Sequence, residues 1–354
     1  MKTQILPPTT ENLQMVSEQI KNGSIGALPT ETVYGLAGNL RNEQSILNIF
    51  QTKNRPSFDP LIVHTAYDPE LNAKQVLYKL EDKNLINLNG FSSDALLKTE
   101  NLIEAFWPGA LTLIFPKGDE VSDLITSGLN TVALRMPKHP YFQEVLKRSQ
   151  CEICAPSANR FGRISPTQSN HVLTELEGKI PWILDGGNCK IGIESTIVFI
   201  NLTGEVQLLR PGAIEKEKIE EILNEPVVSS CSNIKSNKPL SPGTLKSHYA
   251  PKKPLFLFHS TSELSTQFDC NKKTAILFFQ ENDLEQFTQA HKEANLSCYQ
   301  ILTKNGEPAV AAKNLFASLR TLDESTAEIL YAQTCPTNKG LEFAINDRLK
   351  RAAC

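Results

Sequence analysis

The sequence predicts a mixed α/β protein with two domains, a larger one on a partly antiparallel sheet and a smaller one on a parallel sheet. Its 354 residues suffice for about two domains of ordinary size. Strand-like runs follow one another irregularly in the first 225 residues, whereas strands and helices alternate after residue 255. Between them, a stretch rich in Ser, Asn, Lys and Pro has almost no periodicity. We therefore place the domains at 1–225 and 255–354, with a linker at 226–254.

Hydrophobic periodicity defines the elements of the larger domain. The opening helix is the clearest, because Leu13, Val16 and Ile20 share one face, Thr10 can cap it and Gly23 can end it. The expected helices cover residues 10–22, the segment from Asn42 to Phe50, 94–106, 140–149, 167–177 and 215–224. The expected strands cover 24–28, 61–64, 110–115, 131–136, 151–155, 182–185, 194–200 and 205–209. Because several strands follow each other directly, this part should be α+β or mixed α/β with a partly antiparallel sheet, rather than doubly wound.

The smaller domain shows a regular alternation. Apolar runs predict four strands, and helical patterns follow the last three of them. The expected strands cover 255–258, 275–278, 298–302 and 328–331, and the expected helices cover 282–295, 307–321 and 340–351, with a shorter one at 261–268. This order predicts a parallel sheet with crossover helices.

Composition excludes several classes of protein. The net charge of -3 argues against a chain that binds nucleic acid over its whole surface. No run of about 18 apolar residues occurs, and the first ten residues lack the apolar core of a secretion signal. We expect a cytoplasmic protein without membrane contact, whose eight cysteines stay reduced. Cys151 and Cys154 are three apart on a predicted strand and so face opposite sides, which argues against a metal site.

Several polar segments carry the candidate chemistry. Residues 28–37 follow a strand and hold two Thr, a Glu and a Gly, which predicts a ligand-binding turn or an ordinary one. Lys53 and Arg55 lie two residues apart before the strand that ends at His64. A lysine point charge beside an arginine fork suits phosphates, but both cations can instead stabilise a helix end, and a lone His there is more often a core residue.

An arginine on an apolar strand raises a separate question. Arg135 ends the run Thr-Val-Ala-Leu-Arg, where burial without a partner would be costly. It needs an anion, which is either a carboxylate of the protein or a carboxylate ligand. The sequence leaves both alternatives open.

Three later segments are rich in hydroxyl, amide and charged groups. The loop of residues 155–167 holds Ser, Asn and Arg side chains that can bind phosphate or ribose oxygens, or simply form a polar loop. Residues 193–197 and 208–212 place a Glu, a Ser and an Arg at strand ends. The linker contains His248 and Tyr249, and an ordered His-Tyr pair in a linker suggests a segment that docks over a ligand.

Together and in this order, these segments resemble the threonylcarbamoyl-AMP synthases, in the long YrdC-type form with an extra C-terminal domain. The resemblance is strongest from Pro29 to Arg210 and from Ser241 to Pro251, and residues 340–350 look like the closing helix of that family. It implies a twisted mixed sheet with a concave basic cavity and a small Rossmann-like parallel domain. It also implies that the linker closes over the active site.

The same resemblance implies a reaction and its partners. Such enzymes join L-threonine, bicarbonate and ATP, with Mg²⁺, into threonylcarbamoyl-AMP and release pyrophosphate. A separate transferase then moves the threonylcarbamoyl group to an adenosine beside the anticodon of certain tRNAs. Weak binding to double-stranded RNA is a further expectation.

Residue roles follow from the matching motifs. Asp59 stands where many members carry Asn, so its charge needs a metal ion or an arginine to offset it. No protein side chain is expected to bind the metal. The resemblance assigns catalysis to Lys53, Arg55, Ser157 and Asn159; L-threonine to Thr32, His64, Arg135, Ala155 and Ser195; and ATP to Arg55, Asp59, Thr131, Ser157, Ser165, Arg210, His248 and Tyr249.

Two rival functions make different predictions. A carbamoyl transferase of the hydrogenase-maturation type should also carry paired CxxC zinc motifs and an acylphosphatase-like segment, and neither is present. A noncatalytic RNA-binding module should bind RNA with an affinity that falls with salt, and should not turn over ATP.

Overall fold

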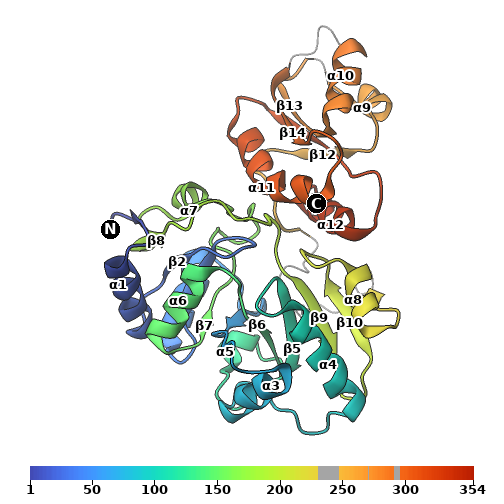
Figure 1. Ribbon diagram of the computed structural model, residues 1–354. Helices are drawn as coiled ribbons and strands as arrows, with labels where there is room; N and C mark the ends of the chain where they lie inside the picture. The colour runs from blue at the N-terminus through green and yellow to red at the C-terminus, as the bar shows by residue number, and fades with distance from the viewer. Residues whose placement is uncertain (230–246, 270, 291–295) are drawn as a thin grey trace.

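The fold consists of two β-sheets with helices packed against them (Figure 1). The computed structural model describes residues 1–229, 247–269, 271–290 and 296–354. The larger sheet has eleven strands with both parallel and antiparallel pairs, and the smaller has four strands that all pair in parallel. The predicted mixed α/β class is confirmed.

The larger sheet has the strand order β1-β8-β2-β3-β7-β4-β6-β5-β9-β10-β11. Its strands are β1 (Gln4–Leu6), β2 (Gly26–Leu28), β3 (Gly35–Asn39), β4 (Ile62–His64), β5 (Leu111–Pro116), β6 (Thr131–Arg135), β7 (Ile153–Cys154), β8 (Trp182–Leu184), β9 (Thr196–Ile200), β10 (Val206–Arg210) and β11 (Val228–Ser229). Each of the predicted strand runs overlaps one of them. The sequence does not predict β1, β3 or β11, because β1 and β11 are too short to show a pattern and β3 contains two glycines.

The helices of this part pack on the sheet through two apolar cores. One core lies under α1 and α6 and includes Trp182, and the other lies under α2, α3 and α4. The helices are α1 (Thr10–Lys21), α2 (Glu43–Lys53), α3 (Ala73–Asp82), α4 (Ser93–Phe106), α5 (Asp123–Thr126), α6 (Pro140–Ser149), α7 (Ser169–Leu176) and α8 (Lys216–Leu223). Helices α3 and α5 are not among the predicted elements, although α3 buries Val76, Leu77 and Leu80 at helical spacing.

Helix ends agree with the predicted caps to within one residue. Asn42 caps α2, since its side chain accepts a hydrogen bond from the Ser45 amide at 2.9 Å. The cap of α1 is Thr9 rather than the predicted Thr10, because the Thr9 hydroxyl accepts from the Asn12 amide. Gly23 follows α1 with a φ of +89°, which suits a helix stop.

The smaller sheet has the order β12-β15-β13-β14 and confirms the predicted parallel arrangement. Its strands are β12 (Leu255–Phe258), β13 (Thr274–Gln280), β14 (Leu296–Thr303) and β15 (Ile329–Gln333), and its helices are α9 (Thr261–Gln267), α10 (Glu281–Ala290), α11 (Pro308–Glu324) and α12 (Gly340–Ala352). The last part of the predicted helix at 282–295 lies outside the described residues, as does most of the predicted linker.

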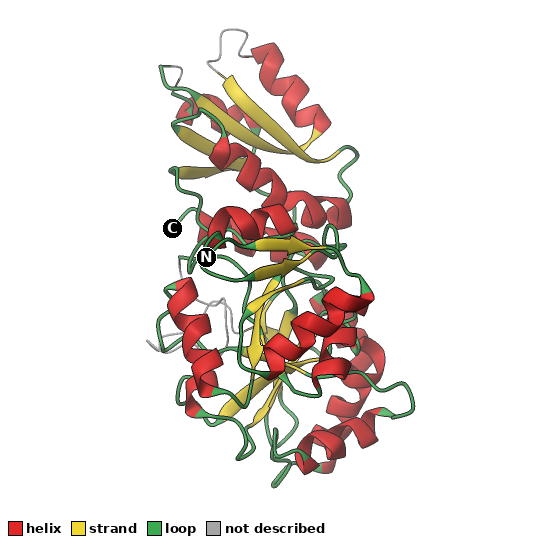
Figure 2. Ribbon diagram, turned by 90° about the vertical axis from the view of Figure 1, so that its left-hand side faces the viewer, coloured by secondary structure: helices red, strands yellow, loops and turns green. Residues whose placement is uncertain are grey.

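Helices α11 and α12 face the larger sheet and join the two parts (Figure 1). Figure 2 shows helices lying between the two sheets. An apolar cluster spans the junction, because Val33 and Ile193 pack with residues of the smaller part such as Phe316. Gly192 permits this approach, since a Cβ at that position would lie 2.5 Å from the Cα of Lys313.

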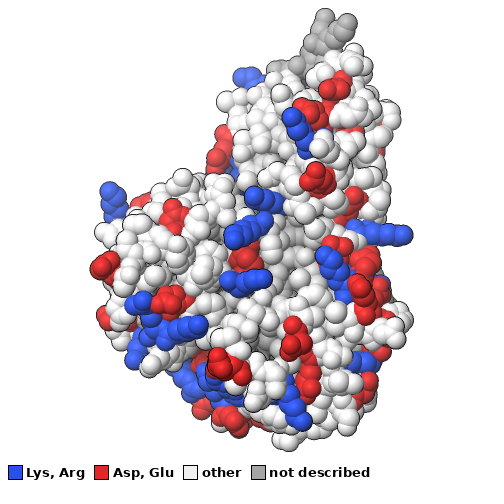
Figure 3. Space-filling view, in the orientation of Figure 1, with Lys and Arg blue, Asp and Glu red and all other residues white. Residues whose placement is uncertain are grey.

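The surface carries both signs of charge. Figure 3 shows acidic and basic side chains interspersed over one face of the molecule. Within the described part of the chain, none of the helices combines the length and the apolar character needed to cross a membrane.

Candidate functional site

A cavity lies where the turn after β2, the ends of several strands of the larger sheet and residues 248–249 come together. The empty space among its lining residues, part of which is open to solvent, is about 550 Å³. Three arginines and one glutamate are its charged lining residues among those described, so the cavity is basic. Its lining consists of Thr30, Thr32, Val33, Gly35, Arg55, Ile62, His64, Arg135, Ala155, Pro156, Ser157, Glu194, Ser195, Arg210, His248 and Tyr249.

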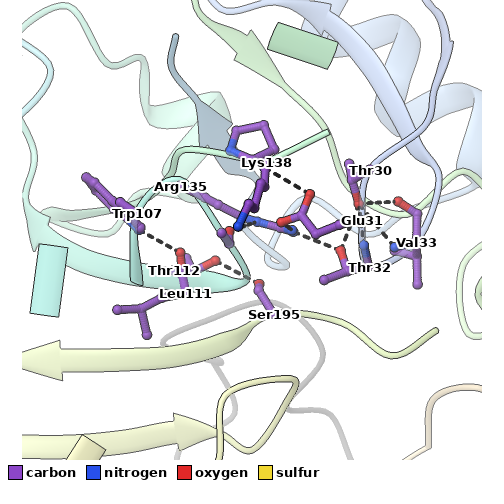
Figure 4. A network of polar contacts seen from close by, with 12 residues as sticks. Thr30, Glu31, Thr32, Val33, Trp107, Leu111, Thr112, Arg135, Lys138 and Ser195 are labelled. Atoms are coloured by element: carbon purple, nitrogen blue, oxygen red, sulfur yellow. Dashed lines mark hydrogen bonds and ion pairs between the residues drawn. The ribbon is translucent and has the colours of Figure 1, made fainter. Parts of the chain in front are cut away.

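Arg135, the last residue of β6, is buried and ion-paired with a protein carboxylate. Its Nη2 donates to Glu31 Oε1, and its Nη1 donates to Thr32 Oγ1 at 3.0 Å (Figure 4). Its Nε donates to the carbonyl of Gly109 at 3.0 Å. Of the two alternatives that the sequence leaves open, the structure shows the protein carboxylate. A ligand carboxylate would therefore add to an arginine that is already neutralised.

The turn between β2 and β3 aims Glu31 and Thr32 at this arginine. The Thr30 hydroxyl accepts hydrogen bonds from the amides of Thr32 and Val33, each at 3.1 Å. Such a hydroxyl closes a turn without a further backbone bond. As Figure 4 shows, Glu31 and Thr32 then point toward Arg135. The predicted tight turn thus positions one edge of the cavity.

His64 lies at the same end of the cavity. Strands β4 and β6 are parallel neighbours with His64 opposite Arg135, so both side chains lie on one face of the sheet. The imidazole packs on Phe142 with ring centres 5.1 Å apart. Burial, helped by the charge of Arg135, lowers the pKa of His64 to about 3. The ring is therefore neutral at physiological pH.

Ser195 and Arg210 form the next part of the wall. Arg210 Nη2 donates to the carbonyl of Ser195 at 2.9 Å and to its hydroxyl at 3.0 Å. The Ser195 hydroxyl also lies 2.8 Å from Thr112 Oγ1. Gly212 allows the loop after β10 to approach, since a Cβ there would lie 2.5 Å from the carbonyl oxygen of Glu194. Burial lowers the pKa of Arg210 to about 10, so it stays charged.

Arg55 forms a buried ion pair at the opposite side. Its Nη2 lies 2.9 Å from Asp59 Oδ2, and it also donates to the carbonyls of Asp59 and Pro60 at 2.9 and 2.7 Å. Burial raises the pKa of Asp59, whereas Arg55 opposes that rise. The arginine thus offsets the charge that the sequence leaves unbalanced. Asp59 itself is fully buried and does not line the cavity.

Lys53 points at the backbone of the loop after β7. Its Nζ donates to the carbonyls of Ser157 and Asn159, and its side chain is fully buried. Burial lowers the pKa of this amine well below its ordinary value, with Arg55 adding to the effect. Asn159 lies in the same loop and donates to the carbonyls of Arg160 and Arg163 at 2.7 and 2.9 Å. Lys53 and Asn159 therefore fix the loop that carries Ser157.

Glu194 connects the cavity wall to helix α12. One of its carboxylate oxygens accepts from the Ser165 hydroxyl at 2.6 Å, and the other lies 3.1 Å from Arg348 Nε. Both partners are fully buried and lie behind the wall. Of the three, only Glu194 lines the cavity.

His248 and Tyr249 close the cavity on the side of the smaller sheet. Their rings contact each other with centres 4.1 Å apart, and Tyr249 stacks on Phe316 of α11 at 5.4 Å. Tyr249 has a left-handed φ of +65°, which is strained for a residue with a bulky side chain. Burial raises its pKa to about 12, and burial together with nearby cations lowers the pKa of His248. Both rings are therefore neutral at pH 7.

Polar atoms without a protein partner gather around this cavity. In the described part of the chain, His64 Nδ1, His248 Nδ1 and Tyr249 Oη are buried and have no hydrogen-bond partner. All three residues line the cavity. Buried polar atoms are rarely left unpaired in native proteins. Their concentration here indicates a site built for a polar ligand.

The structure brings ten of the fifteen predicted site residues into one cavity and places five behind or beside it. The ten are Thr32, Arg55, His64, Arg135, Ala155, Ser157, Ser195, Arg210, His248 and Tyr249. Lys53 and the Asn159 amide donate to the carbonyl of Ser157, Asp59 pairs with Arg55, and Ser165 donates to Glu194, all from behind the lining. Thr131 is the first residue of β6 and lies on the same face as Arg135, but it is not among the described residues that line the cavity.

Two carboxylates of the site have no assigned role in the sequence analysis. Glu31 and Glu194 lie inside the polar segments 28–37 and 193–197, and each is ion-paired with a buried arginine. The sequence does contain an indication of Glu31, because Arg135 on its apolar strand requires an anionic partner. Arg348 lies in the segment that resembles the family's closing helix, but the resemblance assigns no role to any residue there.

Two family models match the chain and together cover most of it. The model described as "Telomere recombination" (Sua5_yciO_yrdC) matches residues 18–212. The model described as "Threonylcarbamoyl-AMP synthase, C-terminal domain" matches residues 214–354.

Curated relatives and solved structures agree with these models. A threonylcarbamoyl-AMP synthase of Bacillus subtilis is 34% identical over 340 residues, which is 94% of this chain and 90% of the relative. One of Pyrococcus abyssi is 33% identical over 94% of this chain and 92% of the relative. The crystal structure of P. abyssi Sua5 complexed with L-threonine matches 99% of this chain and 98% of its own, with a TM-score of 0.82 and 30% identity.

Proposed function

The chain belongs to the threonylcarbamoyl-AMP synthase family, and from this membership we infer how its cavity works. It is an enzyme that condenses L-threonine, bicarbonate and ATP to threonylcarbamoyl-AMP and pyrophosphate, a nucleotidyl transfer. The observation that carries this function is one basic cavity that joins Arg135, Arg55 and Arg210. Its product supplies threonylcarbamoyladenosine modification of tRNA.

We propose that L-threonine binds at the Arg135 end. The P. abyssi relative was crystallised with L-threonine, and the residues that the family resemblance assigns to it here lie within one cavity. Arg135 has five N–H donors, and three contacts within the protein leave donors for a carboxylate. The hydroxyls of Thr32 and Ser195 and the neutral imidazole of His64 then face the amine and hydroxyl of the substrate.

We propose that ATP occupies the end lined by Arg55, Ser157, Arg210, His248 and Tyr249. Two arginines can neutralise phosphate oxygens, and the two buried aromatic rings can contact the nucleotide. The unpaired Nδ1 of His248 and Oη of Tyr249 would then find partners on the ligand. Lys53 and Asn159 act from behind, because they hold the loop of Ser157 in place.

Mg²⁺ is proposed to arrive with ATP. The carboxylates nearest the cavity, those of Glu31, Asp59 and Glu194, are each paired with an arginine, so none is suited to be a direct metal ligand. The metal would be held by the triphosphate and would neutralise part of its charge. The protein residues that complete this neutralisation are Arg55 and Arg210.

The chemistry requires positioning rather than a covalent nucleophile. The threonine amine and bicarbonate form a carbamate with loss of water. A carbamate oxygen attacks the α-phosphate, a new O–P bond forms, and the bond to pyrophosphate breaks. Holding the two substrates in line in a cavity with low access to water accelerates such a step and protects the reactive anhydride. We further propose that a separate transferase consumes the product and that binding of RNA by this chain is weak.

Pyrophosphate release tests the function. Purified protein with ATP and Mg²⁺ should release pyrophosphate only when L-threonine and bicarbonate are both present. Arg55→Ala should lower that rate by about 100-fold, because a positive charge at the phosphates is lost. Arg41→Ala is the matched control, since Arg41 forms an exposed ion pair with Glu120. Thermal unfolding of each variant shows whether it is folded.

If folded protein releases no pyrophosphate in response to threonine but binds duplex RNA with an affinity that falls with salt, the chain is an RNA-binding module instead.

A further inference from the structure

Among the described residues, Arg348 on helix α12 is the largest charged side chain that is completely buried. It is 0% exposed. Its Nε lies 3.1 Å from Glu194 Oε2, and its Nη1 donates to the carbonyl of Pro211 and to Asp347 Oδ2, the latter at 3.1 Å. These contacts join α12 to the two segments that carry Glu194 and Arg210. A residue of the smaller part thus lies directly behind the wall of the cavity and contacts it.

Arg348 also contacts the aromatic side of the cavity. Its guanidinium lies 5.5 Å from the centre of the Tyr249 ring, within the range of a cation–π contact. The same helix holds the neighbouring residue, because the His248 amide donates to the carbonyl of Arg351 at 3.1 Å. Helix α12 therefore supports both residues of the His-Tyr pair.

The negative charge of Glu194 would weaken the binding of an anionic ligand if no cation were paired with it. Glu194 is the one acidic residue among the described residues that line the cavity. An unpaired carboxylate there would repel phosphates in a medium of low dielectric. Arg348 neutralises it, and Ser165 donates a hydrogen bond to its other oxygen at 2.6 Å.

We propose that Arg348 is a positioning residue of the synthase, which neutralises Glu194 and fixes Tyr249 so that the cavity accepts ATP. The proposal rests on the function proposed above and deepens it. It gives α12 a defined part in the reaction, because the ATP end of the cavity is complete only with a side chain from the smaller part. Arg348 acts through its neighbours and does not itself line the cavity.

The pattern of kinetic constants tests this role. Arg348→Met should raise the KM for ATP about tenfold or more and change the KM for L-threonine by less than about twofold, because the lost contacts lie at the ATP end. Arg348→Lys keeps a charge near Glu194 and should show an intermediate KM for ATP. Lys350→Met on the same helix is the control, since Lys350 is exposed and should behave as the unmodified chain.

A second substitution separates the proposed route from a general loss of structure. Glu194→Gln removes the charge that Arg348 neutralises, so the double variant Arg348→Met with Glu194→Gln should recover at least about threefold in the KM for ATP over Arg348→Met alone. A neutral pair is also easier to bury than a single charge. If Arg348→Met does not fold, the double variant carries the test, with an expected KM for ATP within about tenfold of the unmodified value.

Three results would overturn the proposal. They are an unchanged KM for ATP in folded Arg348→Met, equal rises in both KM values, and a double variant that folds but regains no ATP affinity. Each is read only against unmodified protein that releases pyrophosphate with threonine. If the unmodified chain has no such activity, the proposed function fails first, and the two failures are thereby distinguished.

Discussion

The two ends of the cavity differ in where their buried charges find partners. At the threonine end, Arg135 is neutralised by Glu31, and both belong to the larger sheet and its turns. At the ATP end, Arg55 pairs with Asp59 within the larger part, but Glu194 is neutralised by Arg348, which lies 154 residues later on α12. The first end is thus complete within the larger part, whereas the second depends on the smaller part. A domain without an evident catalytic motif can still supply the electrostatics of an active site.

The difference also separates direct roles from supporting ones. Arg135 lines the cavity and retains free donors, so its partner Glu31 orients it without blocking it. Arg348 lies behind the wall, and the residue that lines the cavity is its partner. At the threonine end the arginine of the ion pair therefore lines the cavity, whereas at the ATP end the glutamate lines it.

Arg135→Met should produce the largest effect and tests the threonine end. Arg135 and the threonine carboxylate would form a buried, hydrogen-bonded charge pair. Truncating one member of such a pair costs about 2–5 kcal/mol, so we expect kcat/KM for L-threonine to fall by about 1000-fold. Pyrophosphate release at varied threonine concentration measures it. Arg148→Met is the control, because Arg148 pairs with Glu144 within one helix in a more exposed position.

The rescue experiment then sharpens the comparison between the ends. Adding Glu31→Gln to Arg135→Met should restore part of the thermal stability but not the activity, because the threonine carboxylate still lacks its arginine. A double variant that recovers activity would show that Arg135 serves only to balance Glu31. The two ends would then work in the same way.

A smaller effect is expected from pH on folding stability. Its size tests whether water is excluded from His64 at the threonine end of the cavity. The pKa of His64 is about 3 in the folded chain and 6.5 when exposed. Between these values the unfolded chain binds a proton that the folded chain does not, so the contribution of His64 is full above pH 6.5 and is lost as pH falls. At pH 5 the loss is about 2 kcal/mol.

Urea unfolding of the unmodified chain and of His64→Gln from pH 5 to pH 8 measures this contribution. The variant should lose less stability on acidification, and the comparison at pH 8, where neither form binds a proton at this position, serves as the control. Equal acid sensitivity in both proteins would mean that water reaches His64 in the folded state.

Asp323→Asn should have the smallest effect and probes the junction outside the cavity. Asp323 on α11 lies 2.9 Å from Arg163 Nη2 and accepts from the Lys252 amide at 2.7 Å. The amide keeps part of this hydrogen bonding, so we expect a loss of about 1 kcal/mol in urea unfolding and a change in kcat of less than about threefold.

Asp119→Asn, an exposed substitution, is the control for Asp323→Asn. A large loss of activity in Asp323→Asn would show that the junction as a whole, and not Arg348 in particular, governs the cavity. That result would weaken the contrast between the two ends.

Local patterns predicted the regular elements well but could not predict the direction of long side chains. The runs around β5, β6 and the four strands of the smaller sheet are long and apolar, so their periodicity was sufficient. Lys53 looked like a phosphate ligand, yet its amine binds a carbonyl 106 residues away in sequence. The residues next to Lys53 in the sequence give no indication of an acceptor so far along the chain.

The partners of the two buried glutamates illustrate the same limit. Arg135 required an anion, and Glu31 stood in a motif that the sequence analysis had selected, so that pair was within reach of sequence reasoning. Arg348 was not, because an arginine on an amphipathic helix is ordinarily solvated. Its burial follows from the approach of α12 to the loop of Pro211, which only the tertiary structure shows.

The separation of 154 residues between Glu194 and Arg348 has a consequence for synthesis of the chain. At about 5–20 residues per second, a ribosome needs about 8–30 s to proceed from one to the other. During that interval the nascent chain already contains both members of the Arg135–Glu31 pair, while Glu194 has no arginine from α12. The site is therefore made in two stages, and its nucleotide end matures only after the second.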